Sequence, residues 1–323
     1  MATVTQLRDG AAEKNKIIWP VIIGLFYVFS TVQIAPFYYG GDQLQYSIFY
    51  ESAVDMDWAD SYEYYQSVLG SKEPIYFLLV KLSAPFLERV YFSSVLNGIL
   101  AGLIYYYFSL FNVALIFRFI FSVNFYLLVL LFAAERLKLG FIFLSLAFLW
   151  GDRVRLALLG ISILAHTQIG LLVVGFYLAN AVSDIKRLNG RMLLHKLPVY
   201  LIVLATFAVI IQYQKGHIDA KVQAYLGQGG VLDVLKVSVF LILAAILSKR
   251  HMEPLIVGLP TLIAAYYLGS ERIAILSYLI FLYYGLQYRR GFNFFVVGTA
   301  IYFAWKGWMF IFNVINYGQG FIQ

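Results

Sequence analysis

The stretch IIWPVIIGLFYVFSTVQIA, residues 17–35, contains no charged side chain. An α-helix needs about 20 apolar residues to cross a bilayer, and this stretch has that length. Pro20 lies inside it, and no small-residue cleavage site follows, which argues against a signal peptide. The stretch therefore predicts a first membrane span close to the N-terminus.

Composition extends this prediction to the whole chain. Of the 323 residues, 62% are hydrophobic and 13% are charged, whereas a soluble domain has about half apolar and about a quarter charged residues. The apolar runs do not alternate with polar residues, which excludes a transmembrane barrel. The chain has no cysteine, so thiolate chemistry and cysteine-ligated metals are excluded. We expect an all-α, polytopic membrane protein, with residues 1–323 forming one domain.

Eleven apolar runs are candidate spans. They cover residues 17–35, 74–90, 92–109, 111–134, 138–151, 156–181, 197–213, 231–248, 254–269, 272–288 and 291–313. Cytoplasmic loops are rich in Lys and Arg, so the basic N-terminus and the segment 135–138 are predicted inside, and the acidic loop 36–73 outside. The net charge of +7 comes mostly from loops, which predicts a bacterial cytoplasmic membrane protein with its N-terminus inside and no nucleic-acid partner.

Several cations do not follow this rule, because the predicted topology places them near the outer face. They are Lys81, Arg118, Arg153, Arg155, Lys236, Arg272 and Lys306. A charge in the hydrocarbon costs about 2.5–3.5 kcal/mol and usually faces a cavity or a partner; the alternative is that the side chains snorkel to the interface. Together they predict a basic outward cavity suited to phosphate or pyrophosphate, which arginine binds well.

Three residues are candidates for acid–base chemistry. The pair Gly40-Gly41 allows a tight turn that presents Asp42. Glu73 precedes Pro74, so it either caps a helix or, like Asp42, accepts a proton from a sugar hydroxyl. His166 either hydrogen-bonds across helices or acts as a proton acceptor in the cavity.

Two later segments are candidates for substrate binding. The loop 214–230 contains Lys221 and Tyr225; tyrosine stacks on sugar rings, although a plain connector fits this spacing equally well. Glu271 precedes Arg272 at a predicted helix start and is placed to orient it. We expect loops 36–73 and 214–230 to form part of the active site. No ligand spacing indicates a metal, and no cofactor is expected.

The order of these motifs resembles the EpsG and Wzy group of polysaccharide polymerases over most of the chain. The matching motifs are Gly41-Asp42 with Tyr46, Glu73-Pro74-Ile75-Tyr76, Arg153-Val154-Arg155-Leu156-Ala157 followed by His166, Lys221 with Tyr225, and Glu271-Arg272. Fewer residues separate Arg153 from His166 than in many members, and Thr167-Gln168 follows the histidine. The resemblance implies a GT-C-like fold and assembly of O-antigen or exopolysaccharide on undecaprenyl pyrophosphate at the outer face. A chain-length regulator and a flippase of the same pathway are the implied protein partners.

A glycosyltransferase acting on lipid-linked donor and acceptor glycans is therefore the expected activity. Arg153, Arg155 and Arg272 are expected to stabilise the departing pyrophosphate, with Arg118 as a deeper contact. Lys81, Tyr46, Lys221, Tyr225 and Glu271 are the further substrate-binding candidates, and His166, Asp42 and Glu73 are the unranked candidates for the base. The alternatives are an O-antigen ligase or another GT-C enzyme, a flippase of lipid-linked sugars, and a membrane acyltransferase.

Overall fold

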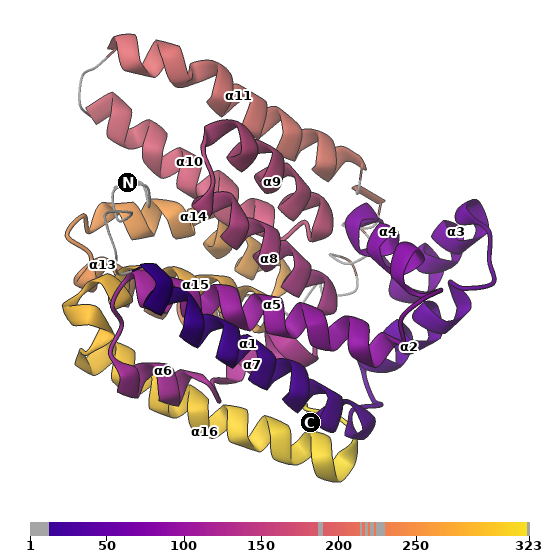
Figure 1. Ribbon diagram of the computed structural model, residues 1–323. Helices are drawn as coiled ribbons and strands as arrows, with labels where there is room; N and C mark the ends of the chain where they lie inside the picture. The colour runs from indigo at the N-terminus through magenta and orange to yellow at the C-terminus, as the bar shows by residue number, and fades with distance from the viewer. Residues whose placement is uncertain are drawn as a thin grey trace. The chain divides into compact units, whose positions relative to one another are not determined.

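The chain is helical throughout the part that the structure describes, as the composition predicted. A computed structural model describes residues 13–186, 190–213, 215–216, 219, 223 and 230–321, and no strand occurs among them. The chain divides into two compact units (Figure 1). Unit 1 comprises Met1–His166 and Val297–Gln323, and unit 2 comprises Thr167–Val296.

Unit 1 carries most of the helices. It contains α1 (Glu13–Ile34), η2 (Ala35–Phe37), α2 (Asp42–Ser52), α3 (Trp58–Leu69), α4 (Pro74–Ser83), α5 (Arg89–Leu110), α6 (Leu115–Phe121), α7 (Phe125–Phe132), α8 (Glu135–Leu149), α9 (Asp152–Ala165) and most of α16 (Phe294–Tyr317). Helices α2, α3 and α4 gather at the end of the unit where α1 ends (Figure 1). We call this the site end. The opposite end, where α1 begins, is the N-terminal end.

Helices α1 and α5 pack closely because glycines face one another. A Cβ atom on Gly98 would lie 2.9 Å from the carbonyl oxygen of Gly24, and one on Gly102 would lie 3.3 Å from that of Pro20. These pairings also show that the two helices run antiparallel. Small residues spaced in this way are typical of helix pairs in membranes, where backbones pack by direct contact.

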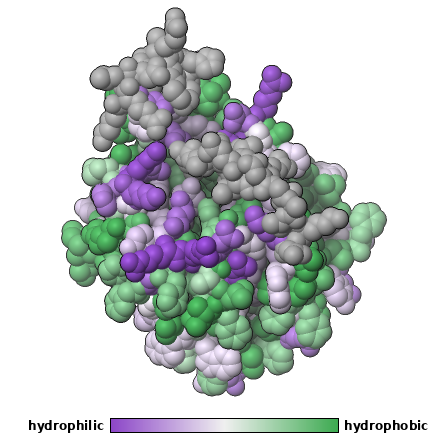
Figure 2. Space-filling model, turned by 60° about the vertical axis from the view of Figure 1, so that its left-hand side comes forward, coloured by the Kyte–Doolittle hydropathy of each residue, from purple (hydrophilic) through white to green (hydrophobic). Residues whose placement is uncertain are grey.

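Three helical segments of the described chain are long and apolar enough to cross a membrane. They are Lys16–Phe37, Arg89–Leu110 and Arg289–Tyr317, and α6 with α7, bent by 50°, would make a fourth. Large apolar side chains on α1, such as Phe26 and Phe29, are exposed. Much of the described surface visible in Figure 2 is hydrophobic, as expected where lipid is the solvent. The remaining apolar helices are shorter, so the number of eleven spans stays a prediction.

Three of the predicted spans are not continuous helices, and one of them, 111–134, contains the separate helices α6 and α7. The run 74–90 contains α4, which has 10 residues, and then a turn before α5 begins at Arg89. A helix of this length extends about 15 Å, half of the ~30 Å hydrocarbon thickness. The run 156–181 is interrupted between Ala165 and Ile169, where α9 ends and α10 begins.

The short α4 corrects the predicted topology of the following segments. The segment 135–138 was expected on the face opposite to loop 36–73, and this is wrong. Arg136 lies 3.1 Å from Glu73, and Glu135 lies 2.8 Å from Arg89. Helix α4 is too short to cross, so the chain is still at the site end when α5 begins. Counting 74–90 as a span therefore places the segment 135–138 on the wrong face of the membrane.

The α8–α9 hairpin leads away from the site end and back. Helix α8 begins at the site end, and near its other end the carbonyl of Ser145 accepts a 2.7 Å hydrogen bond from the Tyr107 hydroxyl of α5. Since α5 runs antiparallel to α1, this contact lies toward the N-terminal end. Helix α9 therefore begins at the N-terminal end and returns His166 to the site end.

Unit 2 is a separate helical bundle. It contains α10 (Ile169–Lys186), α11 (Gly190–Tyr213), α13 (Val231–Leu247), α14 (Met252–Leu268), α15 (Ser270–Gln287) and η3 (Arg289–Gly291). The hydroxyl of Tyr200 on α11 donates to Asp184 on α10 at 2.6 Å, and Tyr284 on α15 donates to Glu253 on α14 at 3.1 Å. Polar contacts therefore connect neighbouring helices within this unit.

Candidate functional site

A buried carboxylate, Glu73, is the centre of a polar cluster at the site end of unit 1. Its Oε1 lies 2.6 Å from Nδ1 of His166, and its Oε2 lies 3.1 Å from Nη1 of Arg136. The three side chains are 7%, 15% and 12% exposed. Ser71 also donates to Oε2, at 3.0 Å. Residues from three distant segments of the sequence thus meet at one carboxylate.

The backbone before α4 directs Glu73 into this cluster. Glu73 occupies the N-cap position with φ −77° and ψ 105°, an extended conformation that the following Pro74 favours. Glu73 therefore stands at the start of the helix, as the alternative interpretation expected, but its carboxylate makes no capping hydrogen bond and contacts the cluster instead. The hydroxyl of Tyr65 donates to the Glu73 carbonyl at 3.0 Å and holds this turn in place.

His166 reaches Glu73 because α9 ends just before it. The residue has φ −159° and ψ 116°, and its backbone N–H still donates to the Ser162 carbonyl at 3.0 Å. The chain then turns through Thr167 and Gln168 before α10. An uninterrupted helix over 156–181 would not leave the imidazole in this extended position, so the break is what places His166 at the carboxylate.

Tyr46 is a further member of the cluster around Glu73. Its hydroxyl accepts a 3.2 Å hydrogen bond from Nε of Arg136. Burial raises the pKa of Tyr46, and the attraction of Arg136 offsets this rise only in part. The phenol therefore stays protonated and keeps a hydrogen to donate. Asp42, one helical turn earlier on α2, is exposed, and its negative charge also raises the pKa of Tyr46.

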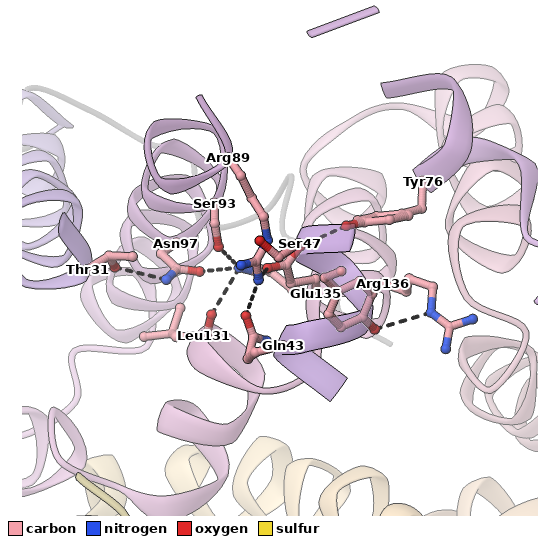
Figure 3. Close-up of polar contacts among 12 residues, drawn as sticks. Thr31, Gln43, Ser47, Tyr76, Arg89, Ser93, Asn97, Leu131, Glu135 and Arg136 are labelled. Carbon is pink, nitrogen blue, oxygen red and sulfur yellow. Dashed lines mark hydrogen bonds and ion pairs between the residues drawn. The ribbon is translucent and has the colours of Figure 1, made fainter. Parts of the chain in front are cut away.

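A second ion pair involves Glu135, the residue before Arg136 on α8 (Figure 3). Arg89 of α5 contacts Glu135 of α8 at 2.8 Å, and Tyr76 of α4 donates to the same carboxylate at 2.8 Å. The Tyr76 ring packs edge-on against the Tyr46 ring, with centroids 5.5 Å apart. A tyrosine pair thus connects the Glu135 pair to the Glu73 pair, and four helices contribute to one polar core.

The structure does not bring Arg153 and Arg155 to this cluster. Arg153 is exposed at the start of α9, about 20 Å along the helix from His166 at 1.5 Å per residue. Arg155 donates to Asp152 at 2.9 Å and to the Trp150 carbonyl at 3.2 Å, within its own turn. Both arginines lie toward the N-terminal end of unit 1.

Two further predicted substrate contacts bind backbone carbonyls instead. Arg118 donates to the carbonyls of Val113 and Phe108, both at 3.0 Å, where α5 ends. Lys81 donates to the carbonyls of Ala53 and Met56, in the turn after α2. These cations satisfy carbonyls that the helix ends leave without partners, which gives both of them a structural role.

The remaining cations are arranged in other ways. Lys236 lies 3.4 Å from Asp233, one turn earlier on α13. Lys306 lies 5.6 Å from the ring centroids of both Phe125 and Tyr302, as in cation–π contacts. Glu271 and Arg272 belong to the first turn of α15, and their side chains lie outside what the structure describes. Lys221 and Tyr225 lie outside the described residues.

The sequence reasoning missed half of this cluster. The segment 135–138, which contains Glu135, Arg136 and Lys138, is predicted to be a loop because charges at the ends of apolar runs usually mark loops, and Arg89 is not singled out by the sequence. Three charged residues within four positions, 135–138, directly before an apolar run were the available signal. Among the described residues, no group of three His, Asp or Glu side chains lies close enough to hold a metal ion. Comparison with protein-family models, curated proteins and solved structures finds no match for this chain.

Proposed function

We propose that the chain is a polymerase of lipid-linked oligosaccharide repeat units in a bacterial cytoplasmic membrane. It transfers a growing glycan from undecaprenyl pyrophosphate to a hydroxyl of an incoming lipid-linked unit, as the motif order implied. The observation that carries this proposal is the buried Glu73–His166 pair, 2.6 Å apart, with Arg136 on the same carboxylate. The eleven spans and the GT-C-like fold belong to the same proposal.

The proton of the acceptor hydroxyl goes to the Glu73–His166 pair. The hydroxyl is a weak nucleophile, and a positioned base contributes about 10²–10⁴-fold to such reactions. A carboxylate beside an imidazole stabilises the imidazolium that forms when the ring takes a proton. Asp42, exposed near Tyr46, is the remaining candidate base in this region. The acceptor oxygen forms a bond to the anomeric carbon as the bond from that carbon to pyrophosphate breaks.

The leaving pyrophosphate carries away the electron pair, so cations near the reacting carbon stabilise the transition state. Arg136 and Arg89 are the arginines beside the Glu73–His166 pair in unit 1. Arg153 and Arg155, about 20 Å and about 16 Å along α9 from that pair, are not part of this centre. The leaving group comes from the lipid-linked donor itself, so no nucleotide sugar is required.

The charges of unit 1 favour an outward-facing site. Lys16, Arg118 and Arg153 lie toward the N-terminal end, whereas the site end carries the acidic segment 36–73. The positive-inside rule then puts the N-terminal end in the cytoplasm. If 74–90 is not counted as a span, Arg118 and Arg153 lie on the cytoplasmic side and agree with the positive-inside rule. In the topology predicted from the sequence they did not.

This orientation predicts the outcome of cysteine labelling, which the cysteine-free chain makes simple. Ala59→Cys on α3 and Arg153→Cys on α9 both replace exposed residues. In intact spheroplasts, a membrane-impermeant maleimide is expected to label the first variant and not the second. Labelling of the second is expected only after lysis. Labelling of Arg153→Cys in intact cells, with Ala59→Cys protected, would put the site in the cytoplasm and remove the outer-face reaction.

A surface-glycan ladder tests the activity itself. In a host whose polysaccharide cluster contains this gene, deletion is expected to reduce the ladder to a single capped repeat unit, and the wild-type gene is expected to restore it. Loss of all repeat units from the outer face would instead indicate a flippase. Polymer that persists but stays on its lipid carrier would indicate a ligase.

A further inference from the structure

A buried set of charges beside the Glu73–His166 pair is not balanced. Glu135 is 1% exposed and Lys138 is fully buried. Lys138 donates to the side chains of Asn97 and Ser93 and to the Leu131 carbonyl, which are all neutral acceptors. No carboxylate of the described residues makes a contact ion pair with this ammonium group, although Glu135, one turn earlier on α8, attracts it from a greater distance.

Counting the charged side chains of the two ion pairs and Lys138 gives an excess of one. The partly buried Arg89 and Arg136 and the buried Lys138 occur with two buried carboxylates, Glu73 and Glu135, so these five side chains carry a net charge of 3 − 2 = +1. Each carboxylate makes a contact ion pair with one arginine, and Glu135 attracts Lys138 as well, so two carboxylates serve three cations. An uncompensated buried charge is strongly unfavourable, and such charges in membrane proteins usually have a partner or a ligand.

Gln43, on α2, adds an unpaired donor at the same place. It is 6% exposed, and its Oε1 accepts a hydrogen bond from Nη2 of Arg89. Because a guanidinium only donates, this contact fixes the amide orientation and leaves Nε2 as a donor. Among the described residues, Gln43 Nε2 and Arg89 Nε are buried donor atoms without an acceptor. Most buried polar atoms have a partner.

We propose that Gln43 and Arg89 bind a phosphate oxyanion, and that this anion balances the excess charge of the cluster. Phosphate oxygens accept hydrogen bonds from both amide and guanidinium donors, and arginine matches phosphate geometry well. The phosphate comes either from an anionic lipid headgroup or from the pyrophosphate of a lipid-linked substrate. Only the second source depends on the proposed function.

Thermal stability measures this binding without any turnover. The protein is purified in a maltoside detergent, which has no phosphate, and pyrophosphate is compared with sodium chloride at equal ionic strength. Phosphatidylglycerol is compared with diacylglycerol in a second arm. We expect one of the two phosphate sources to raise Tm by about 5 °C, as a ligand near 100 times its Kd does for a chain of this size. A response to pyrophosphate assigns the substrate, and a response to phosphatidylglycerol alone assigns the lipid.

Two substitutions on α2 provide the matched comparison. Gln43→Leu removes the buried donor and is expected to abolish the Tm increase. Gln45→Leu, which replaces an exposed glutamine on the same helix, is expected to keep it. An equal increase in all three proteins would mean an adventitious ion only and would overturn the proposal.

Gln43→Glu tests the charge deficit directly. Its carboxylate can still accept the hydrogen bond from Arg89 and supplies the missing negative charge. We expect this variant to melt above the wild type without added phosphate and to show no further increase with it. A lower Tm, with the wild-type response to phosphate retained, would show that phosphate does not bind at Gln43 and would overturn the proposal. Since no step requires glycan transfer, these results stand or fall separately from the polymerase.

Discussion

Replacing Glu73 by glutamine is expected to reduce the surface glycan to single capped repeat units, with a loss of transfer of about 10²–10⁴-fold. The amide keeps the shape of the side chain and one oxygen for Arg136, whose Nη1 lies 3.1 Å from Oε2 in the wild type. It cannot stabilise an imidazolium at His166, so the pair loses its ability to take the proton of the acceptor. Ladder length at matched protein abundance is the measurement.

Two further variants separate catalysis from folding in this experiment. Glu73→Asp keeps the negative charge opposite Arg136 but draws the carboxylate back from His166. We expect this variant to fold and to transfer about 10²-fold more slowly, as misplacement by roughly 1 Å does elsewhere. Glu63→Gln, an exposed carboxylate on the neighbouring α3, should leave the ladder unchanged. A full ladder from Glu73→Gln would falsify the role of this pair as the base.

The class of the fold follows directly from the sequence, because apolar content is a property of composition. The helix boundaries at 83–89 and 165–169 do not, since both lie inside or between apolar runs. Hydropathy does not distinguish one span from two short helices joined by a turn. The first break does contain Pro85, a turn signal that the hydropathy pattern overrode, whereas the second break, 166–168, contains neither glycine nor proline. Counting α4 as part of a full span was enough to assign the segments that follow it to the wrong face of the membrane.

The candidate site was predictable in part for a related reason. Asp42, Tyr46, Glu73 and His166 were found because each is a polar residue in an apolar context or in a loop with a turn signal. Arg136 was missed because a basic residue between two apolar runs has a simpler explanation as a loop charge. The observation that distinguishes a buried ion pair from a loop charge is the 3.1 Å contact of Arg136 with Glu73. These residues are 63 positions apart in the sequence, so the sequence alone does not reveal the contact.

Arg136→Met is expected to give the largest loss of stability among single substitutions at the site. Removing one partner of a buried ion pair leaves the other charge without compensation, at a cost of about 3–5 kcal/mol. Glu73 would lose this cation while keeping His166 and Ser71 as neighbours, and the Tyr46 hydroxyl would lose its donor. Thermal or denaturant unfolding in detergent measures this loss. Arg155→Met is the matched control, because its partner Asp152 is 91% exposed; exposed pairs contribute about 0–1 kcal/mol.

The double variant Glu73→Gln with Arg136→Met then distinguishes structure from chemistry. Replacing both charges removes the uncompensated carboxylate, so the double variant is expected to regain most of the stability that Arg136→Met loses. It should nevertheless make no polymer, because it lacks both the carboxylate that supports His166 and the cation nearest to it. Recovery of the ladder together with stability would mean that the pair only holds α4 against α8. Recovered stability without polymer is the result expected if Glu73 and Arg136 have two roles. They hold α4 against α8, and they also support proton transfer to His166 and stabilise the leaving pyrophosphate.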